Sequence, residues 1–226
     1  MNPFLDKTTP VEINNGGNLP HWHQDGKIQF ITFRLADSLP QSKICELRLM
    51  ITKFNKAHPK PWDKATAIRY QNMLGHAEEK LLDNGYGSCI LQYAEFRQII
   101  ISSLRYYSQQ FYNMVAFVIM PNHLHALLRF YTGIKTEKIL HSIKSYTAHK
   151  INMKLHHTGS IWMKEYFDRI VRSEENLQKY IEYIENNPKH LPPEKFDLYI
   201  RDIQLMTSNE LCEPGQREAY TMMRDD

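Results

Sequence analysis

The chain has 226 residues, 42% of them hydrophobic, which is enough to bury the core of one large domain, or of one domain with an appended tail. Its formal net charge of +3 permits a polyanionic partner but does not require one. The three cysteines, Cys45, Cys89 and Cys212, are widely separated and lie outside any CxxC pattern, so they suggest neither a disulfide framework nor a cysteine zinc site.

The first ten residues lack a basic stretch followed by an apolar run, as a secretory signal would have. The longest apolar run, Val115 to Met120, is far shorter than a membrane span. We therefore expect a soluble protein that stays in the cytoplasm and has no membrane partner.

The first half of the chain predicts one strand and three helices. Apolar and polar residues alternate at the start of Lys27 to Leu35, which is typical of a strand. Helical spacing of apolar residues predicts helices over Gln41 to Lys56, Lys64 to Leu82 and Tyr93 to Gln109. A Pro-rich elbow, His58 to Trp62, joins the first two of these helices.

The second half predicts a central hairpin, followed by helix, strand and helix. The hairpin consists of two β-like runs around the turn Pro121-Asn122. Its strands are Asn113 to Met120 and His123 to Phe130, and the later elements are a helix over Thr136 to Leu155, a strand over Tyr166 to Val171 and a helix over Glu174 to Asn187, with Ser173 as N-cap and Pro188 as the limit.

This order of elements favours an α+β fold, a ferredoxin-like or RRM-like antiparallel sheet covered by helices, with a separate helix that carries a tyrosine. We assign residues 1–188 to one domain, with a helical insertion at about 41–83, and residues 189–226 to a C-terminal tail.

The segment His123-Leu-His125 is the first candidate for chemistry. Successive side chains of a strand face opposite ways, so His123 and His125 project from the same face. Two neutral imidazoles can share a divalent metal and leave coordination positions open for a phosphate oxygen. The simpler interpretation is a pair of hydrogen-bonded histidines. A second pair, His21 and His23, lies in a polar segment that we interpret as a loop.

The helix from Glu174 carries the second candidate. Leu177, Ile181 and Ile184 mark a buried stripe, whereas Tyr183 lies on the flank of that stripe with Asn187 four residues later on nearly the same side. A phenol is a possible nucleophile, and its ordinary pKa of about 10 means that attack near neutral pH needs a cation or a base. The simpler interpretation is a partly exposed aromatic residue and a helix-end asparagine.

Several segments together resemble the REP-associated tyrosine transposases, a branch of the single-tyrosine HUH transposases (IS200-like). They cover about residues 19 to 188. The segments are Leu19-Pro-His-Trp22, Phe30-Ile-Thr-Phe-Arg-Leu-Ala-Asp-Ser-Leu-Pro40, Ala57-His-Pro-Lys-Pro-Trp62, Gly87-Ser-Cys89, Val118-Ile-Met-Pro-Asn-His-Leu-His125, Ser142-Ile-Lys-Ser-Tyr146, Trp162 to Arg172 and Tyr183-Ile-Glu-Asn-Asn-Pro188.

The resemblance implies that His123, His125 and Asn187 hold Mg²⁺ or Mn²⁺ and that Tyr183 is the nucleophile. It also implies cleavage of single-stranded DNA at the foot of hairpins, through a 5′-phosphotyrosine with a free 3′-OH, by a monomer or homodimer. After Pro188 the chain reads Lys-His-Leu-Pro-Pro and departs from the family's pattern.

Other side chains are candidates for DNA contact. Cations could neutralise backbone phosphates and aromatic rings could stack on unpaired bases. These candidates are Lys144, Lys150, Lys154, Trp162, Tyr166, Arg169 and Arg172.

Three other functions compete with strand transfer. A catalytically idle protein that binds hairpins in DNA or RNA for regulation would not need the intact His, Tyr and Asn set. A metal-dependent phosphodiesterase that uses water would tolerate loss of Tyr183. A two-histidine cyclic phosphodiesterase would need paired His-x-Ser/Thr motifs, which the sequence lacks.

Overall fold

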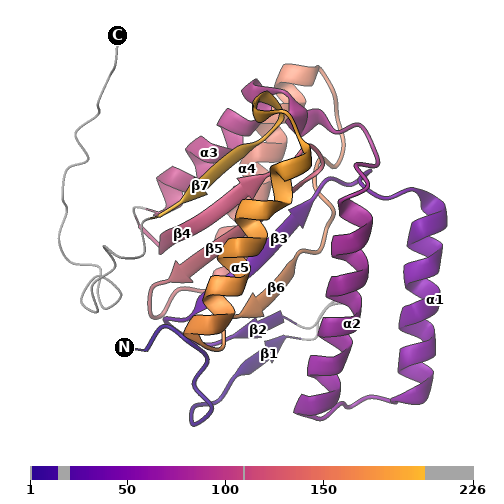
Figure 1. Cartoon of the computed structure of the whole chain (residues 1–226), viewed down its shortest axis with the longest axis vertical. Coiled ribbons are helices and arrows are strands. Elements are labelled where there is room, and N and C mark those ends of the chain that lie inside the picture. Colours follow the sequence, from indigo (N-terminus) through magenta and orange to yellow (C-terminus); the bar gives the residue numbers. More distant parts are fainter. Residues whose placement is uncertain (1, 15–20, 109, 202–226) are drawn as a thin grey trace.

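A computed structural model of the protein describes residues 2–14, 21–108 and 110–201. A central sheet carries helices on both faces, and a pair of long helices stands beside one edge (Figure 1). Within these ranges, every helix is too short or too polar to cross a lipid bilayer.

The central sheet has five strands in the order β6-β3-β5-β4-β7, and every neighbouring pair is antiparallel. β4 and β5 form the predicted hairpin in the middle of the sheet. The antiparallel α+β fold expected from the sequence is confirmed. The strands are β3 (Ile28–Arg34), β4 (Tyr112–Ile119), β5 (His123–Phe130), β6 (Phe167–Ile170) and β7 (Asp197–Ile200).

The two faces of the sheet are covered by different helices (Figure 1). α3 (Ala94–Ser108) and α4 (Thr136–Leu155) pack on one face, where Leu124 and Leu128 of β5 join their core cluster. α5 (Glu174–Asn186) packs on the other face, against Leu127 of β5. The period of two along β5 therefore places His123 and His125 on the α5 face.

The residues assigned to an insertion at about 41–83 form two helices, as predicted, and this helical hairpin stands at the β6 edge. It consists of α1 (Gln41–Ala57) and α2 (Lys64–Leu82), whose apolar sides share a cluster with Phe167 of β6. The side chain of Asp63 caps α2 by accepting a 2.7 Å hydrogen bond from the backbone N–H of Thr66.

The segment His21–His23 is not the predicted loop. It forms β2 and pairs with β1 (Glu12–Asn14) in a separate two-stranded sheet. Burial of Trp22 against Ala67 and Ile170 explains the difference, because a large apolar side chain ties this polar segment to the core.

The chain after Pro188 returns to the sheet. It makes two short 3-10 helices, η2 (Asn187–His190) and η3 (Pro193–Lys195), and then β7, which pairs with β4. The first part of the segment assigned to a tail thus supplies the fifth strand, and residues 202–226 lie outside the described ranges. A further 3-10 helix, η1 (Ile90–Gln92), precedes α3.

Candidate active site

The two histidines of β5 lie side by side beneath α5, with ring centroids 4.7 Å apart. Both side chains are buried, at 1% and 0% exposure. Thr32, directly opposite His125 on β3, places its hydroxyl 2.8 Å from Nδ1 of that ring. The pair thus lies where the interior strands hold it rigidly, as the period of two predicts.

Asn122 determines which nitrogen of His123 is free. The Asn122 amide N–H₂ group donates to the carbonyls of Leu82 and Tyr86, both at 3.2 Å, so its Oδ1 faces His123. Because Oδ1 can only accept, Nδ1 of His123 must carry the proton of their 2.7 Å hydrogen bond. Nε2 of His123 therefore keeps its lone pair.

Burial keeps both imidazoles neutral. It lowers the pKa of His123 to about 3, with a smaller contribution from the charge of His190. Burial, followed by the neighbouring His123, also lowers the pKa of His125 well below its ordinary value. Both rings therefore offer lone pairs rather than positive charges near neutral pH.

α5 brings Tyr183 to this pair. Ser173 caps the helix by accepting from the N–H of Asn176, as predicted, and Leu177, Ile181 and Ile184 are buried against the sheet. From the flank of that stripe the Tyr183 hydroxyl reaches Nε2 of His125 at 3.3 Å. The ring centroids of Tyr183 and His125 are 5.1 Å apart.

The surroundings of Tyr183 hold its phenol in the protonated form. Burial raises its pKa most, and the carboxylates of Glu79 and Asp83 raise it further. A hydrogen bond from the side chain of Asn187 acts in the opposite direction. Both carboxylates come from the C-terminal end of the α2 segment, so the helical hairpin contributes charge to the site.

Two buried acceptors near Tyr183 have no hydrogen-bond partner among the described residues: Nε2 of His123 and Oδ1 of Asn187. An unpaired buried acceptor is costly, and a cation would satisfy both atoms. Imidazole nitrogen and amide oxygen suit a divalent metal, so the residues present fit one. In the part of the chain that is described, no cluster of three or more His, Cys, Asp or Glu is arranged to hold a metal.

Four of the side chains predicted to contact DNA lie on or beneath α4. Lys144 donates to the carbonyls of Met163 and Lys164, both at 2.7 Å, and burial lowers its pKa to about 8. Lys150 lies over the ring of Tyr146, and Lys154 pairs with Glu95 at 2.9 Å. Trp162 is 5% exposed and donates to Thr147, so it is a core residue in this structure.

The other three lie around β6. Tyr166 stacks on His21 with centroids 4.3 Å apart, and His21 in turn binds the buried carboxylate of Asp168 at 2.6 Å. Arg169 and Arg172 both line a pocket between β6 and α2. The structure thus separates the predicted DNA contacts into an α4 group and a β6 group.

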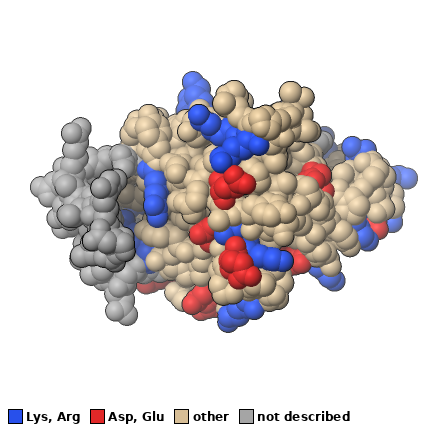
Figure 2. All heavy atoms as spheres, turned by 90° about the horizontal axis from the view of Figure 1, so that it is seen from above, with Lys and Arg blue, Asp and Glu red and all other residues tan. Residues whose placement is uncertain are grey.

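Charge alone does not mark a DNA surface on the face seen in Figure 2. Basic and acidic side chains are intermixed there, so neither sign dominates that face. Electrostatic attraction of a polyanion would therefore depend on local groups.

Sequence reasoning missed the residues that support the site. Thr32 and Asn122 orient the two imidazoles, and Glu79 and Asp83 act on the tyrosine. Thr32 could have been found from its place on the first predicted strand, since residues 30 and 32 of a strand point to the same face of the sheet. The carboxylates carry no such signal, because their approach depends on how the helical hairpin docks.

Comparisons with known proteins agree with this picture. Residues 91–187 match the family described as Transposase IS200 like. That segment holds β4, β5, α4, β6 and α5, and with them all four proposed site residues. Over this segment the match agrees with the resemblance to IS200-like transposases that the sequence motifs suggest.

A solved structure described as a REP-associated tyrosine transposase bound to a REP hairpin is also similar. It is 16% identical over 76% of this chain and 72% of that chain, with a TM-score of 0.42. Among curated proteins, none matches this sequence.

Proposed function

We propose that this protein nicks and rejoins single-stranded DNA beside hairpins, with Tyr183 as nucleophile and a divalent metal, Mg²⁺ or Mn²⁺, on His123, His125 and Asn187. It would act in the cytoplasm, as expected from the sequence, and as a monomer or homodimer.

The observation that supports this most directly is the contact between the Tyr183 hydroxyl and Nε2 of His125, beside buried acceptors that no group satisfies. A core tyrosine that served only packing would not need two neutral imidazoles below it, one of which has a lone pair without a partner. The IS200-like match over residues 91–187 points to the same class of reaction.

The proposed chemistry is a transesterification. The Tyr183 oxygen bonds to phosphorus as the bond from phosphorus to the 3′ oxygen breaks. The phenol loses one proton and the leaving oxygen gains one as a 3′-OH, so no external energy source is needed. A bound divalent cation would supply Lewis-acid stabilisation of the phosphate charge.

Three groups of this chain prepare the tyrosine. α5 holds the phenol over the histidines, and the Asn187 amide favours its phenolate. Glu79 and Asp83 oppose ionisation, so the hydroxyl stays protonated until a positive charge offsets them. The β3 and β5 backbone keeps the imidazoles in place throughout.

The test is incubation with labelled single-stranded hairpin DNA from beside the protein's own gene, with Mn²⁺ or Mg²⁺. We expect a protein–DNA adduct that survives denaturant and is absent in Tyr183→Phe. Tyr106→Phe, an exposed tyrosine on α3, is the control and should still form the adduct.

Other outcomes support other functions. Cleavage that leaves no adduct and persists in the Tyr183→Phe protein would indicate a phosphodiesterase that uses water. Binding with neither adduct nor cleavage, for several flanking hairpins and both metals, would indicate a regulatory protein that binds hairpins in DNA or RNA.

A further inference from the structure

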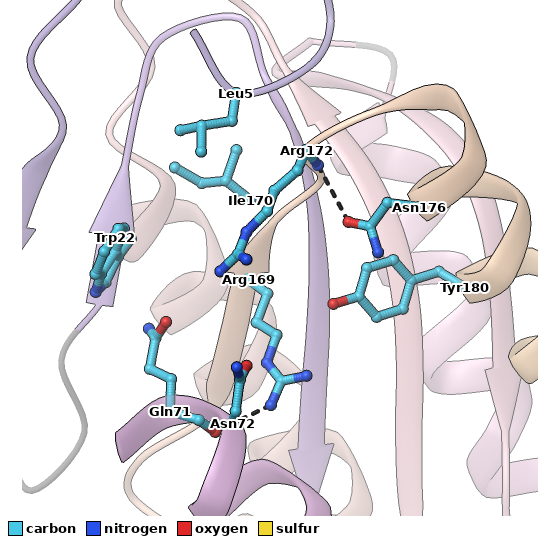
Figure 3. A pocket seen from close by; sticks show the side chains of 9 residues that line it. All are labelled: Leu5, Trp22, Gln71, Asn72, Arg169, Ile170, Arg172, Asn176 and Tyr180. Carbon is cyan, nitrogen blue, oxygen red and sulfur yellow. Dashed lines mark hydrogen bonds between the residues drawn. The ribbon is translucent and has the colours of Figure 1, made fainter. Parts of the chain in front are cut away.

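A pocket of about 140 Å³ lies between β2, β6, α2 and α5, apart from the histidine pair. Figure 3 shows the guanidinium groups of Arg169 and Arg172 directed into the space between Trp22 on one side and Tyr180 on the other. Asn72 of α2 contributes an amide to the same space. Ligand pockets for drug-sized molecules are larger, about 300–1,000 Å³, so this one has room for a single base or phosphate group.

Two buried donors of the pocket walls lack an acceptor. Nε1 of Trp22 and Nε of Arg169 are both inaccessible to water and bond to no group in the described ranges. Trp22 is 4% exposed, so its N–H group cannot turn to solvent. Buried donors without partners are rare in native proteins, and an acceptor atom of a ligand would reach these two if the pocket walls shift as it enters.

Arg169 is held in place from two sides. Its Nη2 donates to the carbonyl of Gln71 at 3.0 Å, and its guanidinium lies 4.7 Å from the centroid of the Phe167 ring. Gly75 of α2 lies against this guanidinium, and a Cβ at residue 75 would lie 2.4 Å from Nη2 of Arg169, so the present position of Arg169 suits glycine there. The cation is thus positioned before any ligand arrives.

One aromatic ring, that of Phe30, lies between the pocket and the candidate nucleophile. Tyr180 stacks on Phe30 with centroids 4.4 Å apart. The same Phe30 ring stacks on His125 at 5.3 Å and meets the edge of Tyr183 at 6.0 Å. If a DNA phosphate lies at Tyr183, a neighbouring nucleotide of the same DNA strand is therefore within reach of the pocket.

We propose that this pocket binds one unpaired nucleotide of the DNA strand next to the phosphate that Tyr183 attacks. The nucleotide presents acceptors to Trp22 and Arg169 and its charge to Arg172. This inference rests on the proposed function.

The experiment measures equilibrium binding rather than cleavage. The full-length Tyr183→Phe protein is titrated, by fluorescence anisotropy, against labelled hairpin DNA in which single-stranded nucleotides are replaced one at a time by abasic sites. We expect one position, or two adjacent ones, at which base removal weakens binding roughly tenfold, the scale of one base contact.

Variants link that position to the pocket. Arg172→Ala and Trp22→Phe should each weaken binding of intact DNA. In the Trp22→Phe protein the abasic replacement should then have little further effect, because the two changes remove one interaction. Arg172→Ala should also reduce the slope of log affinity against log salt concentration by about 0.7, the value for one phosphate contact on a single strand. Arg48→Ala, an exposed arginine on α1, is the control and should change neither quantity.

The proposal is overturned if abasic replacement costs the same in the parent and in the Trp22→Phe protein, or if Arg172→Ala behaves like Arg48→Ala. Arg172 is exposed, so that variant decides the matter even if Trp22→Phe fails to fold. An adduct in the cleavage assay together with either of those results would leave strand transfer intact and remove only the pocket. Coupling at one nucleotide without an adduct would do the reverse.

Discussion

At the scale of single residues, the site depends on which imidazole nitrogens keep their lone pairs. Oδ1 of Asn122 accepts a hydrogen bond from Nδ1 of His123, and the Thr32 hydroxyl can accept one from Nδ1 of His125. Partners of this kind fix the tautomer and orientation of a metal ligand and are nearly as important as the ligand itself. His125 differs from His123 because its Nε2 already faces the Tyr183 hydroxyl.

Thr32→Val should therefore weaken metal binding without changing the ligands. Valine has a similar shape but no hydroxyl, so His125 loses the partner of its Nδ1. We expect the Kd for Mn²⁺, measured by isothermal titration calorimetry, to rise about 10- to 100-fold.

Thr52→Val, on the exposed side of α1, is the control and should leave the Kd unchanged. Tyr183→Phe should act in the opposite direction, since it removes the hydroxyl that competes for Nε2, and lower the Kd by about 2- to 10-fold, the range for one hydrogen bond. Equal Kd values for all three variants would contradict the assignment of His125 as a ligand.

Burial of the neutral His123 ring should make the folded protein less stable in acid, because His123 is protonated first in the unfolded chain. Its pKa is about 3 in the folded protein against an ordinary 6.5, so between these values the unfolded chain binds a proton that the folded chain does not. The stability that the neutral ring provides is complete above about pH 6.5 and is lost as the pH falls towards 3, by about 1.4 kcal/mol per pH unit.

Urea unfolding in the presence of EDTA at pH 7.0 and pH 5.5 checks this sign, with His123→Gln as the comparison. Between pH 7.0 and pH 5.5 the free energy of unfolding should fall less in the variant than in the parent protein, and the difference should correspond to about one proton. The comparison is needed because other groups titrate too. In His21, although burial lowers the pKa, the bonded and charged Asp168 raises it overall, so its contribution is present at low pH and lost as the pH rises. If the free energy of unfolding depends on pH equally in His123→Gln and in the parent protein, the His123 ring is not held neutral.

At the scale of elements, the helical hairpin is part of the site rather than an appendage. α2 delivers Glu79 near Tyr183, holds Arg169 through Gln71, and accepts the Asn122 amide at Leu82. All three contacts depend on how α2 lies against β6, and Gly75 of α2 lies against the side chains of Arg169 and Phe167 of β6.

Gly75→Ala tests this approach by the sign of its effect. Helix propensity alone would make alanine more favourable by about 1 kcal/mol. The new Cβ would instead lie 2.4 Å from Arg169 Nη2 and 2.6 Å from Cζ of Phe167, so these two side chains must shift or α2 and β6 must separate. Overpacking of this kind costs about 1–3 kcal/mol, and we expect a lower midpoint of chemical unfolding. A higher midpoint would mean that the contact is loose.

Sequence periodicity was a good guide to elements and a poor guide to their docking. The period of two placed His123 and His125 on one face, and the helical period placed Tyr183 on the flank of α5. The pattern of His21-Trp-His23 was misread because burial of Trp22 depends on α2 and β6, which are distant in sequence. The carboxylates near Tyr183 escaped prediction for the same reason.

At the scale of the whole molecule, the sheet extends beyond the boundary that the sequence suggests. β7 covers the β4 edge, and its Asp197 forms an ion pair with Arg97 of α3. Arg97 is 3% exposed and also donates to the carbonyls of Leu91, Gln92 and Glu194. The chain after Pro188 thus connects the end of the active-site helix to the opposite layer.

Two truncations decide where the folded domain ends. A chain that stops after Pro188 loses β7, leaves the β4 edge unpaired and removes the carboxylate partner of a buried guanidinium. Breaking a buried ion pair by removing one partner costs about 3–5 kcal/mol, and an exposed strand edge promotes association. A chain that stops after Arg201 keeps every described contact and is the control. We expect the shorter chain to unfold at a much lower denaturant concentration, or to aggregate on a sizing column, while the longer one matches the full protein. Equal midpoints for both would restore Pro188 as the domain boundary and make β7 an optional addition to the sheet.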